Sequence, residues 1–257
     1  MIYFWLFVAG FAASVFGSMV GLGGGFIIVP ILRLFLNLPP AVAAGTSLAL
    51  VITNSGSGAL TYLLQRRVHL RTGWLVGAGA IPGSVLGAIA VTHASPRVFD
   101  WLFAALLIGV SADIFLNRAK RKPDSTSTAN VNVLLGMPWP GSLIVGFVVG
   151  FISSLFGVGG GVILVPSLLY FSDLPAHAIS ATSHFGILLT SPLGFLTHVV
   201  QHDIRWVYAI PLAIGGLLGG PLGARLSLRM QSQRLLLLVA AALTIAALAL
   251  IFRHIAR

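Results

Sequence analysis

The chain of 257 residues contains no cysteine and no glutamate, and only 8% of its residues are charged. The absence of cysteine excludes a disulfide framework and thiolate metal sites. A soluble domain usually carries about 25% charged residues, so this chain has too few polar groups to cover a water-facing surface. Its hydrophobic fraction is 57% and its mean hydropathy is +1.01. Because helices satisfy their own backbone groups in lipid, the composition predicts an all-α polytopic membrane protein embedded in a lipid bilayer.

The few charges are mostly positive. Fifteen lysines and arginines against five aspartates give a net charge of +10. In a soluble protein this excess would suggest nucleic-acid binding, but here the basic residues lie in short breaks between apolar stretches, which is typical of loops bordering membrane spans. We therefore expect no nucleic-acid partner. The first 20 residues lack the basic start and small-residue cleavage site of a signal peptide, so they are expected to belong to the mature fold.

The sequence matches itself when it is shifted by 136 positions, and this one offset holds without a gap from Gly10 to Gly87. Two related halves, 1–116 and 142–257, are therefore predicted. Among the matches, Ser18 falls on Ser154, Gly21-Leu22-Gly23-Gly24-Gly25 on Gly157-Val158-Gly159-Gly160-Gly161, Pro30 on Pro166, Thr46-Ser47 on Thr182-Ser183, and Gly79, Gly83 and Gly87 on Gly215, Gly219 and Gly223.

Each half divides into five apolar elements. Three of them approach the roughly 20 residues needed to span a bilayer, whereas the second is too short and directly follows a glycine run. We therefore expect the first two elements of each half to form a broken or re-entrant hairpin at the glycine run. The glycine trios, with small residues every four positions, favour close packing, and the contact between the halves is a candidate place for it. The expected ranges are 3–20, 26–36, 45–65, 73–92 and 98–116, then 142–156, 162–172, 180–200, 206–226 and 235–252.

Segment 117–141 is polar, basic and rich in helix breakers, which is typical of a linker outside the membrane. If loop 66–71 is cytoplasmic, alternating elements place this linker and loop 225–234 in the cytoplasm as well. Ten basic residues are then inside, in partial agreement with the positive-inside rule. An odd number of crossings per half predicts two inverted repeats, as in many secondary transporters, with both termini outside. The five outside are Arg33, Arg97, Arg205, Arg253 and Arg257.

The glycine runs are candidate anion sites. Four glycines in five positions destabilise a helix by about 1 kcal/mol each relative to alanine, and freed backbone groups are tolerated at membrane depth only in protein or beside a cavity. The element that follows presents the positive end of its dipole. Simple close packing of helices is the alternative interpretation. The candidate substrate-binding glycines are Gly23, Gly24, Gly25, Gly159, Gly160 and Gly161.

The third element of each half carries polar residues seven positions apart, which is close to two helical turns and therefore one face. Hydroxyl groups often bond their own helix, but intramembrane polar groups such as Asn54 and His184 are costly and usually functional. His184 is expected to bind substrate or carry a proton, with a buried structural histidine as the alternative. The candidate substrate-binding residues here are Thr46, Ser47, Asn54, Thr182, Ser183, His184, Thr190 and Ser191.

Acidic residues are missing from the predicted spans. All five aspartates fall in loops or near element ends, whereas a cation pathway or a carboxylate proton relay usually needs a carboxylate inside the membrane. Amide, hydroxyl and imidazole groups facing helix N-termini suit an anion instead. An anion leaving a negative-inside cell gains about 2.3 kcal/mol per charge per 100 mV, so export without a coupling ion is our hypothesis. No histidine pair has metal-ligand spacing, and we expect no metal or cofactor.

The doubled glycine motif with Pro30 and Pro166, together with Gly-Thr-Ser at 45–47 and Ala-Thr-Ser at 181–183, resembles the sulfite exporter TauE/SafE family over nearly the whole chain. The resemblance implies a multi-pass permease of the bacterial inner membrane for small sulfur-containing or organic anions, such as sulfite, sulfoacetate or other sulfonates. It supports a transporter of anions better than it supports sulfite in particular.

Three other functions stay open at this point. A channel could share the same broken helices. A membrane enzyme would need a nucleophile with a base, or a metal cluster, and no carboxylate lies near His184 in the sequence; we therefore expect no enzyme. An assembly subunit would tolerate replacement of Asn54 and His184. Association into a homo-oligomer is also open.

Overall fold

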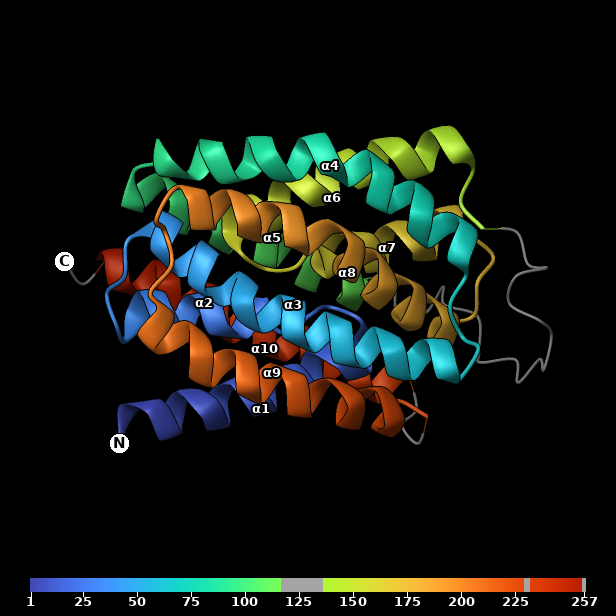
Figure 1. Cartoon of the computed structure of the whole chain (residues 1–257), viewed down its shortest axis with the longest axis horizontal. Helices are drawn as coiled ribbons and strands as arrows, with labels where there is room; N and C mark the ends of the chain where they lie inside the picture. Colours follow the sequence, from blue (N-terminus) through green and yellow to red (C-terminus); the bar gives the residue numbers. More distant parts are fainter. Residues whose placement is uncertain (117–135, 229–231, 256–257) are drawn as a thin grey trace.

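The computed structural model describes residues 1–116, 136–228 and 232–255, and the regular structure within these ranges is helical throughout. Ten helices lie side by side (Figure 1). Their bounds are α1 Ile2–Val20, α2 Gly25–Leu34, α3 Pro40–Leu64, α4 Leu70–Thr92, α5 Pro96–Leu116, α6 Trp139–Phe156, α7 Gly161–Phe171, α8 Ala176–Val200, α9 Trp206–Leu226 and α10 Ser232–Ile255.

The helices confirm the expected membrane fold. Within the described ranges, six helices are long and apolar enough to cross a bilayer: α1, α3, α4, α6, α8 and α9. Large apolar side chains such as Trp74, Ile210 and Leu217 are more than half exposed on their outer faces. A surface of this kind is stable in hydrocarbon and would be unfavourable in water. The chain is therefore a multi-pass membrane protein.

Several helix boundaries differ from the expectation. Helices α3 and α8 begin at Pro40 and Ala176, each directly after a proline in an extended conformation, and proline favours a helix start. The expected starts at 45 and 180 were therefore four to five residues late. Helix α6 begins at Trp139, so the last three residues of the expected linker 117–141 are helical. Residues 117–135 of that linker lie outside the described ranges.

The expected breaks at the glycine runs are confirmed. Helix α1 ends at Val20, and Gly21, Gly23 and Gly24 adopt positive φ angles of 86°, 87° and 79°, a region that glycine enters without steric cost. The amides of Leu22 and Gly23 donate to the carbonyl of Gly17 at 2.8 and 3.3 Å, so the chain folds back on the end of α1. The second run also has positive φ angles, of 70°, 90° and 71° at Gly157, Gly159 and Gly160.

The helices that follow the breaks are short. Helix α2 has 10 residues and α7 has 11, which corresponds to about 15–17 Å at 1.5 Å per residue. The hydrocarbon core is about 30 Å thick. Neither helix can cross it, so each glycine break lies within the molecule rather than at its ends.

The contacts between helices follow the repeat. Helix α1 packs on α9 as α6 packs on α4, and α3 packs on α9 as α8 packs on α4; α3 and α8 contact each other, as do α5 and α10. The glycine trios pack closely against neighbouring helices, as expected. Gly83 and Gly87 lie against the α6 backbone at Phe147 and Phe151, and Gly219 and Gly223 lie against the α1 backbone. Close backbone approach of this kind requires the missing side chain.

Candidate functional site

The two glycine breaks contact each other in the centre of the molecule. A Cβ atom added to Gly25 would lie 2.9 Å from Cα of Val158, and one added to Gly161 would lie 2.6 Å from Cα of Leu22. These distances are shorter than side-chain carbons tolerate, so only glycine fits at either position. The break of the first half and the break of the second half therefore form one packed core element.

Serines from the central helices hold the two breaks. Ser47 on α3 donates its hydroxyl hydrogen to the carbonyl of Gly157 at 2.9 Å, and Ser183 on α8 donates to the carbonyl of Gly21 at 2.7 Å. Both carbonyls close a helix end, where backbone acceptors lack partners within the helix. Ser47 and Ser183 were expected to bind substrate. In the structure each donates its hydroxyl hydrogen to a backbone carbonyl of the opposite half.

A cluster of four buried polar side chains lies beside the first break, and we call Ser18, Asn54, Tyr62 and His184 the Ser18 cluster. Ser18 Oγ lies 2.7 Å from Asn54 Oδ1 and 3.1 Å from His184 Nε2. Asn54 Nδ2 donates to the carbonyl of Gly23 at 3.0 Å, and Tyr62 Oη donates to the carbonyl of Ser18 at 2.6 Å. All four side chains are fully buried, and they come from α1, α3 and α8.

The ring of His184 is fixed by its neighbours. The ring centroids of His184 and Tyr62 lie 5.8 Å apart in an edge-to-face arrangement. On α3, Gly58 makes room for the ring, because a Cβ there would lie 2.7 Å from His184 Cδ2 and Nε2. The nitrogen Nδ1 of the ring is buried and has no hydrogen-bond partner. A buried polar atom without a partner is costly and calls for an explanation, such as a catalytic role or a bound water or ion.

The corresponding place in the second half is built differently. The positions that match Ser18, Asn54 and His184 hold Ser154, Thr190 and Leu48. Thr190 donates to the carbonyl of Ile187 in its own helix at 3.1 Å, and the hydroxyl of Ser154 is buried without a partner. At the second break a threonine and a leucine thus replace the amide of Asn54 and the imidazole of His184, so the two breaks differ in their polar groups.

The remaining expected residues are spread over the molecule. Thr46 accepts a hydrogen bond from the amide of Arg205 at 3.1 Å, and Thr182 accepts one from the amide of His69 at 2.9 Å. Each threonine therefore anchors the loop before α9 or α4, and neither joins the Ser18 cluster. Ser191 is fully buried on α8, and its hydroxyl has no partner.

Arg33 carries a buried charge that the sequence did not reveal. The expected orientation counted it among the five basic residues on the outer side, and it lies in the last turn of α2 with 3% of its surface exposed. Its guanidinium donates to Asp100 on α5 at 2.8 and 2.6 Å and to the carbonyl of Leu38 at 2.6 Å. A bidentate, fully hydrogen-bonded pair is the form in which buried charges are tolerated, so this pair links α2 to α5.

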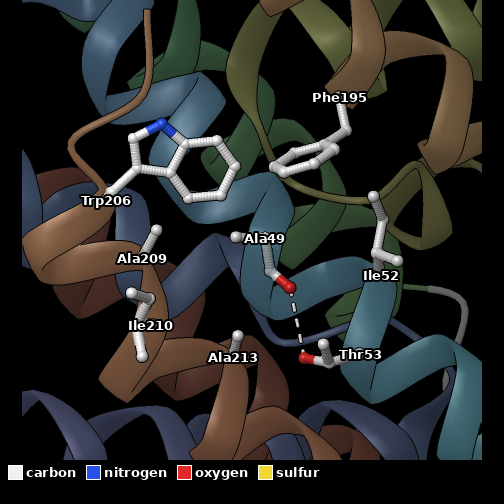
Figure 2. A pocket seen from close by; sticks show the side chains of 8 residues that line it. All are labelled: Ala49, Ile52, Thr53, Phe195, Trp206, Ala209, Ile210 and Ala213. Atoms are coloured by element: carbon white, nitrogen blue, oxygen red, sulfur yellow. Dashed lines mark hydrogen bonds between the residues drawn. The ribbon is translucent and has the colours of Figure 1, made fainter. Parts of the chain in front are cut away.

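An open pocket of about 220 Å³ is lined by none of the residues of the Ser18 cluster (Figure 2). Its lining is apolar except for the hydroxyl of Thr53, which donates to the carbonyl of Ala49 at 3.1 Å. None of the expected site residues lines it. The pocket is formed by α3, α8 and α9 through Ala49, Ile52, Thr53, Phe195, Trp206, Ala209, Ile210 and Ala213.

Small side chains on α3 explain the open space against α9. The positions that match Ala49 and Thr53 hold the larger residues Phe185 and Leu189, which fill the space against α4. Leu189 lies so close to α4 that a Cβ atom added to Gly77 would be 2.8 Å from Leu189 Cβ. Smaller side chains on α3 leave the corresponding space against α9 empty.

Ser18 and Tyr62 were not expected in the site. Ser18 matches Ser154 in the repeat, which was the available signal, but a serine in a helix commonly bonds its own backbone. Tyr62 matches His198, and a change of residue type hid the shared role. Both residues are assigned by tertiary contacts.

Comparison with known proteins finds a matching family profile and relatives named as probable membrane transporters. The profile of the family described as "Sulfite exporter TauE/SafE" matches residues 6–250. The chain is 32% identical to "Probable membrane transporter protein YunE" of Bacillus subtilis, with 97% of both chains covered. It is 29% identical to a "Probable membrane transporter protein" of Haemophilus influenzae, with 86% of this chain and 83% of the relative covered. No solved structure matches the chain significantly.

Proposed function

Because the chain belongs to the sulfite exporter TauE/SafE family, we propose that it exports a small sulfur-containing or organic anion across the bacterial inner membrane. Its relatives are named as membrane transporters. Sulfite is the substrate that the family description names, and sulfonates are a wider expectation from the sequence. We propose alternating access between two inverted repeats as the mechanism.

The arrangement of helices supports inverted repeats. In Figure 1, α3 and α8 run in opposite directions, and so do α1 and α6 and also α4 and α9. These are the pairs that the 136-residue offset relates. Two repeats that cross a bilayer in opposite senses can exchange conformations, and the exchange moves an opening from one side to the other.

The Ser18 cluster is the observation that carries the proposal. It lies where the two glycine breaks meet, between α1, α3 and α8, and it contains a fully buried amide and imidazole. Binding sites of transporters with broken helices lie at such interfaces near the middle of the membrane. We propose that Asn54 and His184, with Ser18, contact the substrate, and that the amides of the glycine breaks add positive potential.

The charges of the described residues support an anion. Two of the carboxylates lie against other side chains: Asp100 bonds Arg33, and Asp203 lies 3.5 Å from His198. No carboxylate of the described ranges forms part of the Ser18 cluster. An anion beside the cluster would therefore meet no negatively charged side chain of these ranges.

Transport by proteoliposomes tests the proposal. Purified protein is reconstituted at a clamped potential and offered sulfite, sulfate, thiosulfate, sulfoacetate, taurine and a few carboxylates. We expect saturable flux of at least one anion, with counterflow, which a channel would not support. Flux without saturation or counterflow would favour the channel, and absence of flux from folded protein would reject anion transport for these compounds.

Variants copied from the other half locate the site. Asn54→Thr installs the residue found at the matching position of the second half, Thr190. His184→Leu installs the residue found at the matching position of the first half, Leu48. Removing one hydrogen bond to a charged substrate should reduce affinity about tenfold or more. Ser154→Ala is the matched control, because its hydroxyl has no partner. Equal losses in all three variants would place the substrate outside the Ser18 cluster.

A further inference from the structure

The hydrogen positions in the Ser18 cluster follow from one backbone carbonyl. The carbonyl oxygen of Gly23 can only accept, so the Asn54 atom at 3.0 Å from it is the amide nitrogen. The carbonyl oxygen Oδ1 of Asn54 therefore faces Ser18. Because Oδ1 can only accept, the hydroxyl hydrogen of Ser18 points to it over 2.7 Å.

The assignment of these two donors, Asn54 Nδ2 and the Ser18 hydroxyl, determines the tautomer of His184. A serine hydroxyl has one hydrogen, and that hydrogen is committed to Asn54. The contact of 3.1 Å between Ser18 Oγ and His184 Nε2 is then a hydrogen bond only if Nε2 carries the hydrogen. In the neutral imidazole the other nitrogen, Nδ1, is left with a bare lone pair.

No protein group described near the ring supplies a hydrogen to Nδ1, which is buried without a partner. Tyr62 is the titratable side chain in contact with the ring, and its hydroxyl hydrogen goes to the carbonyl of Ser18. Among the charged side chains, the guanidinium of Arg67 lies 5.1 Å from the centroid of the Tyr62 ring and donates to Gln65 and Ser227. Arg33 bonds Asp100, and His198 lies beside Asp203. The ring thus offers an acceptor, not a donor, to whatever lies against it.

We propose that Nδ1 of His184 accepts a hydrogen bond from the substrate, so that the site selects oxyanions that still carry an acidic hydrogen. Hydrogensulfite has such a hydrogen, whereas the sulfite dianion and methanesulfonate have none. A fully ionised oxyanion would place its lone pairs against that of Nδ1. This inference rests on the proposed function, because it takes the Ser18 cluster as the substrate site. Each anion moved would carry its hydrogen with it.

Hydrogensulfite and methanesulfonate form a matched pair of probes, since both are monoanions with three oxygens on sulfur. Binding to the purified protein is measured by the shift of its unfolding temperature over a range of pH. We expect hydrogensulfite to bind about tenfold more tightly than methanesulfonate, the value of one hydrogen bond. The advantage should disappear as rising pH converts hydrogensulfite to the dianion, while methanesulfonate, measured at each pH, reports changes in the protein itself.

His184→Gln tests the assigned atom. The side-chain amide of glutamine can keep the N–H that faces Ser18 but has no acceptor at the place of Nδ1. We expect this variant to lose the preference for hydrogensulfite, and Ser154→Ala to retain it. Retained preference in folded His184→Gln overturns the inference. If that variant does not fold, equal binding of the two probes by the unaltered protein overturns it.

The transport assay separates the two proposals. Saturable flux of methanesulfonate as fast as that of sulfite at equal pH would reject the hydrogen requirement and leave anion transport standing. Binding and flux by none of the anions would reject both.

Discussion

Tyr62 and His198 occupy matching positions of the repeat. Each lies at hydrogen-bond distance from a backbone carbonyl, and these two carbonyls, of Ser18 and Ser154, also occupy matching positions. Tyr62 Oη donates to the carbonyl of Ser18 at 2.6 Å, and His198 Nε2 lies 3.0 Å from the carbonyl of Ser154. Both carbonyls belong to the last turn before a glycine break, where acceptors lack partners in the helix. A phenol and an imidazole therefore serve the same structural purpose.

Replacement of Tyr62 by phenylalanine should lower stability by about 1 kcal/mol. The carbonyl of Ser18 would lose its strongest donor and keep only the amide of Gly21 at 3.2 Å. Thermal or denaturant unfolding in detergent measures the effect. Tyr3→Phe, at a position that is 54% exposed, is the control, and equal stability of the two variants would show that the bond contributes nothing.

Gly161→Ala should destabilise the protein strongly, by about 1–3 kcal/mol or more. Its φ angle is not positive, so the cost comes from packing: the new carbon would meet Cα of Leu22 at 2.6 Å in the opposite break. Gly109→Ala is the matched control, since nothing lies within 4 Å of its added carbon and alanine favours helix by about 1 kcal/mol. Comparable yield and unfolding temperature for the two variants would contradict close contact between the breaks.

The ion pair of Arg33 and Asp100 should behave as a unit. Arg33→Leu alone leaves Asp100 buried and unpaired and should cost about 3–5 kcal/mol. The double variant Arg33→Leu, Asp100→Leu copies the residues at the matching positions, Leu169 and Leu236, and should recover much of that loss. A double-mutant cycle on unfolding in detergent measures the coupling. Additive losses would mean that the two charges do not stabilise each other.

Filling the pocket beside Trp206 should stabilise the protein. Ala49→Phe installs the residue of the matching position, Phe185, and a phenyl ring fits an open space of about 220 Å³. Cavity filling typically contributes about 0.5–2 kcal/mol. The unfolding temperature in detergent should rise, and transport should be unchanged because none of the residues of the Ser18 cluster lines the pocket. A fall in stability would show that the space closes or is occupied in the membrane.

The candidate site was only partly accessible to prediction. Asn54 and His184 were identified because polar groups in apolar helices are costly, and the structure brings both to Ser18. Thr46 and Thr182 shared the same helical face, yet they bond the loops before α9 and α4. A helical period shows which side chains share a face, but it does not show which element covers that face. Whether any of these residues binds substrate stays a prediction.

The sequence by itself determined the membrane fold, the two related halves and the breaks at the glycine runs, because composition, a constant offset and the conformational freedom of glycine are local or periodic properties. Only the tertiary structure decided that Arg33 is buried with Asp100 on α5, that Ser47 and Ser183 hold the opposite breaks, and that the residues of the Ser18 cluster gather beside the first break. These contacts join residues more than 30 positions apart, and such pairings are set by how helices pack against one another rather than by any local pattern.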